Sequence, residues 1–420
     1  MTNATIITIG DELLIGQVID TNSAWIAQQL NTIGIRVIRR VAVGDVWDDI
    51  WNALDEESSK ADLILITGGL GPTADDITKP LLCKYFDGKM IINQKALENV
   101  TMLFEKVFKR PITERNLKQA EVPDTCKVLI NTRGTAPGML FEKNGKIFIS
   151  MPGVPGEMKG LMEDIVIPDL KNRYPEFYLA HRTLVTFGIG ESMLADLIQD
   201  FESSLPKTMK LAYLPNYGIV RLRLSAQGND KEQIDSAVDF QFMQLQLLVK
   251  DYLVIAKDVP MENAIAELLI SHQKTISTAE SCTGGYLSHL LTSIPGSSSF
   301  YKGSMITYSN ESKENLLSVN HSTLTQRGAV SEEVVREMAK GLLQQLKTDY
   351  AIAVSGIMGP DGGTIEKPVG MVWIAVGNKS NIISKSFQFR FDRQKNIQVT
   401  AMNAFNLLRI FIINKHRESN

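Results

Sequence analysis

The feature that most limits the possible folds of this chain is a set of short apolar runs that each lead into a glycine-rich turn. Residues 61–67 (A-D-L-I-L-I-T) lead into G-G-L-G, and residues 349–355 (D-Y-A-I-A-V-S) lead into G-I-M-G. Runs that are apolar throughout, with helical patterns between them, are typical of parallel strands buried on both faces. We therefore predict an α/β fold, in which ligands bind beyond the carboxyl ends of the strands.

The length of 420 residues exceeds what one hydrophobic core usually supports. Strand and helix patterns alternate over residues 1–170 and again over residues 258–415. Residues 175–253 have a different pattern, with a hairpin around Tyr217 and a half-exposed strand at residues 220–226. We predict two α/β domains with mainly parallel sheets, joined by a small α+β connector.

Composition narrows the class of protein and its compartment. The net charge of −3 gives no support to bulk nucleic-acid or membrane binding. The longest apolar run, residues 407–413, is interrupted by Arg409, and no signal peptide is expected at the N-terminus. Three cysteines without metal-ligand spacing fit a reducing compartment. We expect a cytoplasmic protein.

The turn after residues 61–67 reads G-G-L-G-P-T-A-D-D-I-T. Its glycines let the backbone approach a phosphate or a pterin-like ring. The adjacent carboxylates of Asp75 and Asp76 suit a hard divalent cation such as Mg²⁺. They equally suit the first turn of a helix, where the dipole favours acidic side chains, so both interpretations stay open.

A second turn, within residues 275–288 (T-I-S-T-A-E-S-C-T-G-G-Y-L-S), carries Ser281 and Cys282 between a strand and a helix. Unpaired N–H groups at such a turn suit attack on a carbonyl beside an anion. The residue pattern alone does not decide between the two nucleophiles. No histidine is suitably placed, so Lys313 is the candidate base and Tyr308 a proton relay. The alternatives are a solvated helix lysine and a core aromatic residue.

Three motifs of the first 170 residues resemble the competence/damage-inducible protein A (CinA) family: G-D-E-L-L-x-G, G-G-L-G-P-T-x-D-D-x-T and P-G-x-P-x-E-M. The resemblance implies a molybdopterin-binding-like fold and metal-dependent hydrolysis of ADP-ribose to AMP and ribose 5-phosphate. It assigns the metal, Mg²⁺ or similar, to Asp75 and Asp76. The nucleotide pocket is assigned to Gly68, Gly69, Gly71, Thr78, Glu12 and Glu157. The connector resembles a KH fold, which we interpret as a spacer or subunit contact rather than an RNA-binding unit.

Residues 262–410 resemble the CinA C-terminal domain, the nicotinamide mononucleotide (NMN) deamidase family, through A-E-S-C-T-G-G, T-Y-S-N-E-x-K and S-G-I-x-G-P-x-G-G. The resemblance favours Ser281 over Cys282 and implies a Ser281–Lys313–Tyr308 catalytic set that needs no cofactor. Its substrate-binding positions are Cys282, Thr283, Gly284, Gly285, Ser355, Gly356, Gly359 and Arg393. Met358 and Arg390 depart from the family pattern.

The expected function is therefore bifunctional recycling of pyridine nucleotides by a homodimer. NMN would be hydrolysed to nicotinate mononucleotide and ammonia in the C-terminal domain, and ADP-ribose in the N-terminal domain. The alternative is a protein that binds a nucleotide or pterin without catalysis and acts in competence or the DNA damage response.

Overall fold

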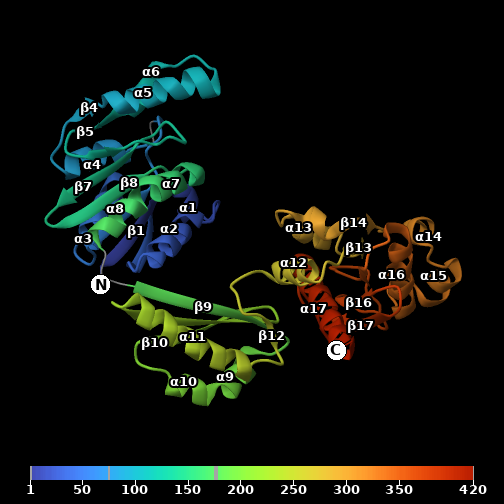
Figure 1. The fold of residues 1–420 in the computed structure, drawn as a ribbon. Helices are drawn as coiled ribbons and strands as arrows, with labels where there is room; N and C mark the ends of the chain where they lie inside the picture. The colour runs from blue at the N-terminus through green and yellow to red at the C-terminus, as the bar shows by residue number, and fades with distance from the viewer. Residues whose placement is uncertain (1, 74–75, 175–177, 420) are drawn as a thin grey trace. The chain divides into compact units, whose positions relative to one another are not determined.

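The structure is a computed structural model that describes residues 2–73, 76–174 and 178–419. Residue contacts divide the chain into two compact units (Figure 1). One comprises residues 1–180 and 225–238, and the other comprises residues 181–224 and 239–420.

A six-stranded sheet runs through the described N-terminal residues, and four of its neighbouring strands, β2, β1, β3 and β8, are parallel. β1 pairs in parallel with β2 and β3, and β3 pairs in parallel with β8. β7 pairs antiparallel with β8, and β6 pairs antiparallel with β7. The strand order is β2 (Arg36–Val43), β1 (Asn3–Ile9), β3 (Leu63–Thr67), β8 (Lys146–Met151), β7 (Gly138–Lys143) and β6 (Lys127–Leu129). The predicted, mainly parallel α/β sheet is confirmed.

Helices cover both faces of this sheet. Ile6 of β1 packs with α2 (Thr21–Thr32), α7 (Pro155–Leu161) and α8 (Ile167–Arg173), whereas its neighbour Ile7 packs with α3 (Trp47–Ser58) and α4 (Thr78–Tyr85). Successive side chains of a strand point to opposite faces, so a strand covered on both sides has to be apolar throughout. The other described elements are α1 (Asp11–Leu14), β4 (Met90–Ile92), α5 (Gln94–Met102), α6 (Glu114–Leu117) and β5 (Glu121–Pro123).

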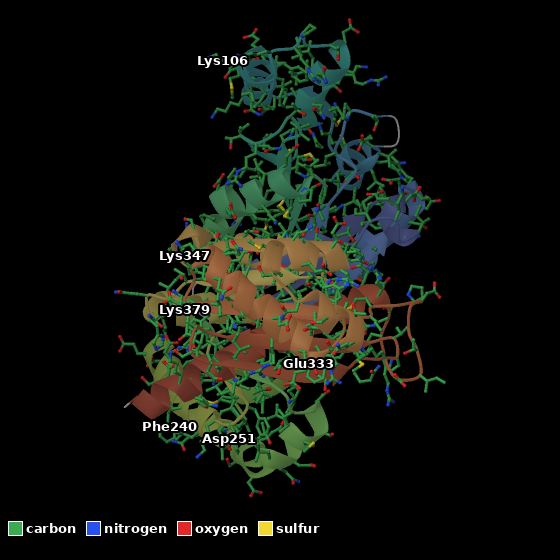
Figure 2. All side chains as sticks on the ribbon, turned by 90° about the vertical axis from the view of Figure 1, so that its right-hand side faces the viewer. Lys106, Phe240, Asp251, Glu333, Lys347 and Lys379 are labelled. Atoms are coloured by element: carbon green, nitrogen blue, oxygen red, sulfur yellow. The ribbon has the colours of Figure 1, made fainter. Side chains whose placement is uncertain are left out.

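The middle segment forms a four-stranded sheet among the described residues, in the order β10 (Met209–Asn216), β11 (Ile219–Gly228), β9 (Tyr178–Phe187) and β12 (Leu253–Ile255). Ile198 leaves the helical conformation and separates two short helices, α9 (Glu191–Leu197) and α10 (Gln199–Ser204). α11 (Lys231–Leu248) carries exposed apolar side chains, Phe240 among them (Figure 2).

The C-terminal sheet has five described strands, in the order β14 (Tyr301–Ile306), β13 (Ile276–Glu280), β15 (Tyr350–Gly356), β16 (Met371–Gly377) and β17 (Ile382–Gln388). β13 is parallel to both of its neighbours, β14 and β15. β16 pairs antiparallel with β15, and β17 pairs antiparallel with β16. Since β13, β14 and β15 point the same way, their carboxyl ends meet at one edge.

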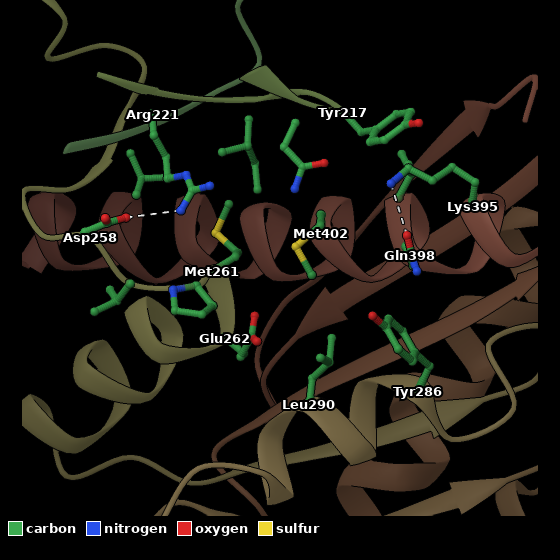
Figure 3. Close-up of a pocket in the computed structure, with 16 residues that line it drawn as sticks. Tyr217, Arg221, Asp258, Met261, Glu262, Tyr286, Leu290, Lys395, Gln398 and Met402 are labelled. Atoms are coloured by element: carbon green, nitrogen blue, oxygen red, sulfur yellow. Dashed lines mark hydrogen bonds and ion pairs between the residues drawn. The ribbon is translucent and has the colours of Figure 1, made fainter. Parts of the chain in front are cut away.

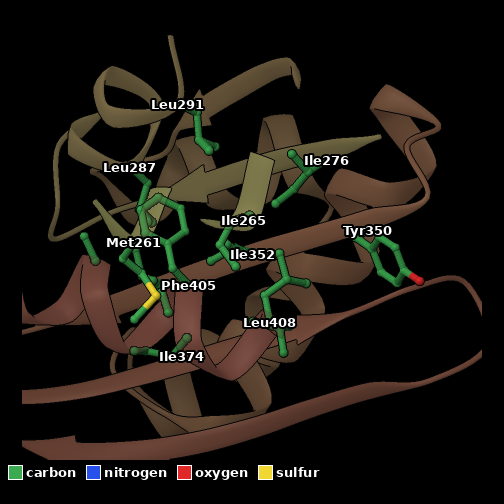
Figure 4. Packing of buried hydrophobic residues seen from close by; sticks show 14 of the residues in the cluster. Met261, Ile265, Ile276, Leu287, Leu291, Tyr350, Ile352, Ile374, Phe405 and Leu408 are labelled. Carbon is green, nitrogen blue, oxygen red and sulfur yellow. The ribbon is translucent and has the colours of Figure 1, made fainter. Parts of the chain in front are cut away.

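α12 (Met261–Ser271), α13 (Tyr286–Thr292) and α17 (Arg393–Ser419) share one core cluster with this sheet (Figure 4). The other face packs α14 (Asn310–Leu317), α15 (His321–Arg327) and α16 (Glu332–Leu346). Ser331 caps α16 by accepting from the Val334 N–H. The 23 residues 393–415 of α17 are long and apolar enough to cross a membrane, but half of that stretch is buried inside this domain. Its apolar face is therefore that of a core helix.

Candidate active site

The turn that carries Ser281 is tied to the strands on both sides of β13. The Ser281 N–H donates to the Val354 carbonyl of β15 at 3.1 Å, and the Thr307 N–H, after β14, donates to the Glu280 carbonyl at 2.8 Å. Ser281 is 8% exposed. The nucleophile candidate is thus held at the edge where the parallel strands end, as the sequence predicts for a ligand site.

Glu280, the last residue of β13, holds the turn in place through hydrogen bonds to its carboxylate. Its side chain is fully buried. Oε2 accepts from the Thr283 hydroxyl and from the N–H groups of Gly285 and Leu287, at 2.8, 3.1 and 3.0 Å. Oε1 accepts from the Ser288 N–H at 2.8 Å. The carboxylate therefore satisfies the N–H groups at the start of α13, a charge-assisted arrangement.

This network corrects the expectation that the N–H groups of residues 282–285 all face a ligand. Gly285 donates to Glu280, and the Gly284 N–H donates to the Ser281 carbonyl at 3.2 Å. In the part of the chain that the structure describes, the N–H groups of Cys282 and Thr283 have no such acceptor. Of the N–H groups expected to stabilise an oxyanion, only those of Cys282 and Thr283 therefore remain without an acceptor among the described residues.

The Glu280→Gln variant is expected to lose about 2–4 kcal/mol of stability, because an amide presents an NH₂ group to backbone donors and leaves buried N–H groups unpaired. Urea denaturation followed by circular dichroism measures the loss, and hydrogen exchange localises it to residues 281–292. Glu314→Gln is the control. Among the described residues the Glu314 side chain pairs with the exposed His321, at 2.9 Å, so Glu314→Gln should cost less than about 1 kcal/mol. Equal midpoints for the two variants would contradict this role of Glu280.

Lys313 lies in α14, whose N-cap Ser309 accepts from the Ser312 N–H. The side chain is 1% exposed, and its Nζ lies 3.0 Å from Ser281 Oγ and 2.7 Å from the Thr307 carbonyl oxygen. Burial lowers the pKa of Lys313. In the described residues no carboxylate pairs with it, so its neutral form is accessible. The solvated-lysine alternative is wrong, and the geometry is that of a nucleophile beside a base.

The environment of Cys282 does not favour its use as a nucleophile. It is 6% exposed and packs in the apolar cluster of this domain. Burial raises the pKa of its thiol to about 12. A thiol needs to ionise to attack, so this residue behaves as a small buried apolar side chain.

Tyr308 and Arg393 meet at the mouth of the site. The Arg393 guanidinium donates to the Gly359 carbonyl at 2.8 Å and to the Tyr308 hydroxyl at 3.2 Å. Tyr308 is 65% exposed, so it is not a core aromatic residue. Within the described chain its hydroxyl makes no hydrogen bond to Ser281 or Lys313. The relay role of Tyr308 stays a prediction, whereas its contact with Arg393 is direct.

These residues line a pocket of about 220 Å³, whose lining is Ser281, Cys282, Tyr308, Lys313, Ala329, Val330, Ser355, Gly356, Met358 and Arg393. Ser355 is fixed by donating to the Ala329 carbonyl at 2.8 Å. The predicted Thr283, Gly284, Gly285 and Gly359 lie outside this lining. Ala329 and Val330 were not predicted as lining, because small apolar side chains carry no chemical signal. Met358, 3% exposed, takes up space that a smaller residue would leave open.

The N-terminal unit has its own pocket of about 410 Å³ at the carboxyl ends of β1, β3 and β8. Gly68, Gly69, Gly71, Glu12, Asp76 and Glu157 line it, together with Asp45 and Gln119, which the sequence did not single out. Gly68 has φ +115°, and a Cβ there would lie 2.1 Å from the Ile9 carbonyl oxygen, so no other residue fits. Thr78 lies outside the lining, where its N–H donates to the Gly69 carbonyl.

The predicted metal ligands are only partly described. Asp75 lies outside the described residues. Asp76 accepts from the N–H groups of Gly71 and Thr73 at 2.8 and 2.9 Å, so it holds the glycine-rich turn together. Among the described residues no three histidine, cysteine or acidic side chains form a metal-binding group. The carboxylates in the lining of this pocket nonetheless supply the oxygen ligands that Mg²⁺ prefers, since Mg²⁺ takes one or two carboxylates and completes its shell with phosphate and water.

Comparison with known proteins covers the whole chain. Residues 5–172 match the probable molybdopterin binding domain, residues 181–253 the damage-inducible protein CinA KH domain, and residues 258–412 the CinA C-terminal domain. A CinA-like protein of Flavobacterium psychrophilum is 45% identical over 406 residues, covering 96% of this chain and 97% of that protein. The chain belongs to the CinA family. The resemblance inferred from the motifs is therefore confirmed.

Other CinA relatives share the same extent. A putative competence-damage inducible protein of Clostridium beijerinckii is 39% identical over 410 residues, covering 97% of this chain and 99% of that protein. Among solved structures, a CinA superfamily protein from Klebsiella pneumoniae is 34% identical and covers 37% of this chain and 96% of that chain, with a TM-score of 0.36. The family matches and the full-length relatives place all three parts of the chain within the CinA family.

Proposed function

We propose that the C-terminal domain hydrolyses the carboxamide of NMN to give nicotinate mononucleotide and ammonia. The observation that carries this proposal is the 3.0 Å contact between Lys313 Nζ and Ser281 Oγ in a buried pocket. Lys313 takes the proton of Ser281 as Oγ attacks the carboxamide carbon. The N–H group of Cys282, a residue of the pocket lining, stabilises the oxyanion.

Ammonia then leaves with a proton from Lys313, and water hydrolyses the acyl-serine ester. Arg393, which lines the same pocket as Ser281, is the anion holder for the phosphate. Two of its donors are engaged by Gly359 and Tyr308, and a guanidinium has further N–H groups to offer. Tyr308 relays the proton or holds Arg393.

The test is incubation of the full-length protein with NMN, following ammonia and nicotinate mononucleotide in equal amounts. Turnover should be insensitive to EDTA, because the proposed residues use no metal. A protein that releases no ammonia, yet gains thermal stability with nucleotide, would instead support the binding-only alternative in competence or damage response.

We propose a second activity, hydrolysis of ADP-ribose, for the N-terminal pocket. The supporting observation is that carboxylates of Glu12, Asp45, Asp76 and Glu157 surround a glycine-rich backbone able to approach a pyrophosphate. Asp75, Asp76 and Glu12 would hold Mg²⁺, which would neutralise the pyrophosphate and activate a water. The homodimer and the cytoplasmic location remain proposals from the sequence.

The full-length protein is expected to release AMP and ribose 5-phosphate from ADP-ribose with Mg²⁺ and to lose this activity in EDTA. Because the NMN reaction is measured in the same sample, it serves as a control for folding. AMP release that is equal with and without EDTA would contradict the metal-dependent proposal.

A further inference from the structure

The unit that holds Ser281 contains another cavity, of about 290 Å³, with a different lining (Figure 3). It lies between the turn of the β10–β11 hairpin, the start of α12, and helices α13 and α17. Met261, Leu290, Val399 and Met402 form its apolar wall. The hairpin is fixed there by the edge-on contact of Tyr217 with Phe391, at 5.3 Å between ring centroids.

Most charged side chains around this cavity already have partners. Arg221 and Asp258 form an ion pair at 3.2 Å, which is drawn in Figure 3. Lys395 donates to the Gln398 side-chain oxygen at 3.1 Å and lies over the Tyr217 ring. Arg221 and Asp258 therefore neutralise each other, whereas the Lys395 ammonium is held by Gln398 and by the Tyr217 ring.

Glu262 differs from them. It is the acidic residue in the first turn of α12, half-buried, and in the described chain its carboxylate has no ion pair and no hydrogen bond to another residue. Burial raises the pKa of Glu262, in agreement with a carboxyl group shielded from bulk water. A shielded carboxylate without a partner is costly, and a cation would remove that cost.

We infer that this cavity binds a small organic cation whose apolar body packs on Met261, Leu290 and Met402 and whose charge pairs with Glu262. The cavity is at the lower end of the range for small-molecule sites, so it fits one ring or a short chain. The shared chemistry is a single positive charge on an apolar body. Either a primary ammonium or a pyridinium ring provides it.

Calorimetric titration of the full-length protein with phenethylammonium and with 1-methylnicotinamide separates the two sources. The neutral analogues 2-phenylethanol and nicotinamide measure the contribution of charge. At least one cation should bind more tightly than its neutral analogue. Glu262→Gln should weaken that cation about tenfold and leave the neutral analogue unchanged. Leu290→Trp, which fills the cavity, should weaken both members of the pair.

The matched control is Glu267→Gln, also in α12, whose carboxylate pairs with Lys257 near the surface. It should leave the affinity for the cation unchanged. The inference is overturned if neither cation binds up to about 10 mM, a range that covers weak specific sites. It is equally overturned if cation binding is the same in the wild type and Glu262→Gln, because the cation then occupies another pocket. Neither result depends on whether NMN is a substrate.

Discussion

Replacement of Ser281 by alanine is expected to abolish ammonia release from NMN, lowering kcat by at least about 10³-fold, because no other hydroxyl replaces the nucleophile. The fold should persist. Ser281 Oγ has one side-chain partner in the described structure, Lys313 Nζ, which keeps its bond to the Thr307 carbonyl. Single-turnover assays with isotopically labelled NMN measure the residual rate, and circular dichroism checks the fold.

Cys282→Ala is the matched control for this experiment. It removes the rival nucleophile from the adjacent position and should keep kcat within about tenfold, the loss being one of packing in a tight core. Wild-type turnover by Ser281→Ala together with inactivity of Cys282→Ala would overturn the serine mechanism. That outcome would require the buried thiol, with its pKa raised to about 12, to ionise in the complex with substrate.

The second large effect is expected for Lys313→Met, which keeps an unbranched apolar stem and removes only the amine. Loss of the base should lower kcat/KM by about 10²–10⁴-fold. The Thr307 carbonyl loses a partner, so some loss of stability accompanies it. Lys379→Met, in an exposed loop, is the control and should leave kcat/KM unchanged.

The pH profile tests the same residue independently. Only neutral Lys313 can accept the proton of Ser281, so kcat/KM of the wild type should rise about tenfold per pH unit below the pKa of Lys313. Burial lowers that pKa from the ordinary lysine value, so the profile should level off below pH 10.5. The residual activity of Lys313→Met should lack this rise. A profile that is flat in the wild type would exclude Lys313 as the titrating base.

The sequence predicted the α/β domains well because buried parallel strands leave a strong signal, as residues 61–67 show. Ser281, Lys313 and Ser355 line one pocket because Ser281 and Lys313 come after β13 and β14, and Ser355 lies near the end of β15, three neighbouring strands of one sheet. Choosing Ser281 over Cys282 required the family resemblance. The structure adds an independent reason, because burial opposes ionisation of the thiol.

Other features depend on contacts that periodicity does not contain. Glu280 was counted only as part of a motif, because an acidic residue at a strand end gives no sign that it will be buried beneath a helix start. The same network removed the N–H groups of Gly284 and Gly285 from the predicted oxyanion donors. The cavity beside Glu262 is formed by segments that are far apart in the sequence, so no local sequence pattern predicts it.

Glu280 also bears on the transfer of this site into other proteins. One carboxylate ties the end of β13 to Thr283 and to the first residues of α13, while Val354 holds the turn from the neighbouring strand. The conformation of the turn therefore depends on these surrounding contacts, and the turn alone would not keep it in another protein. A designer who grafts Ser281 and Lys313 alone would transplant the reactive groups without their alignment. The smallest portable unit is the segment from β13 through α13, with a parallel strand on either side.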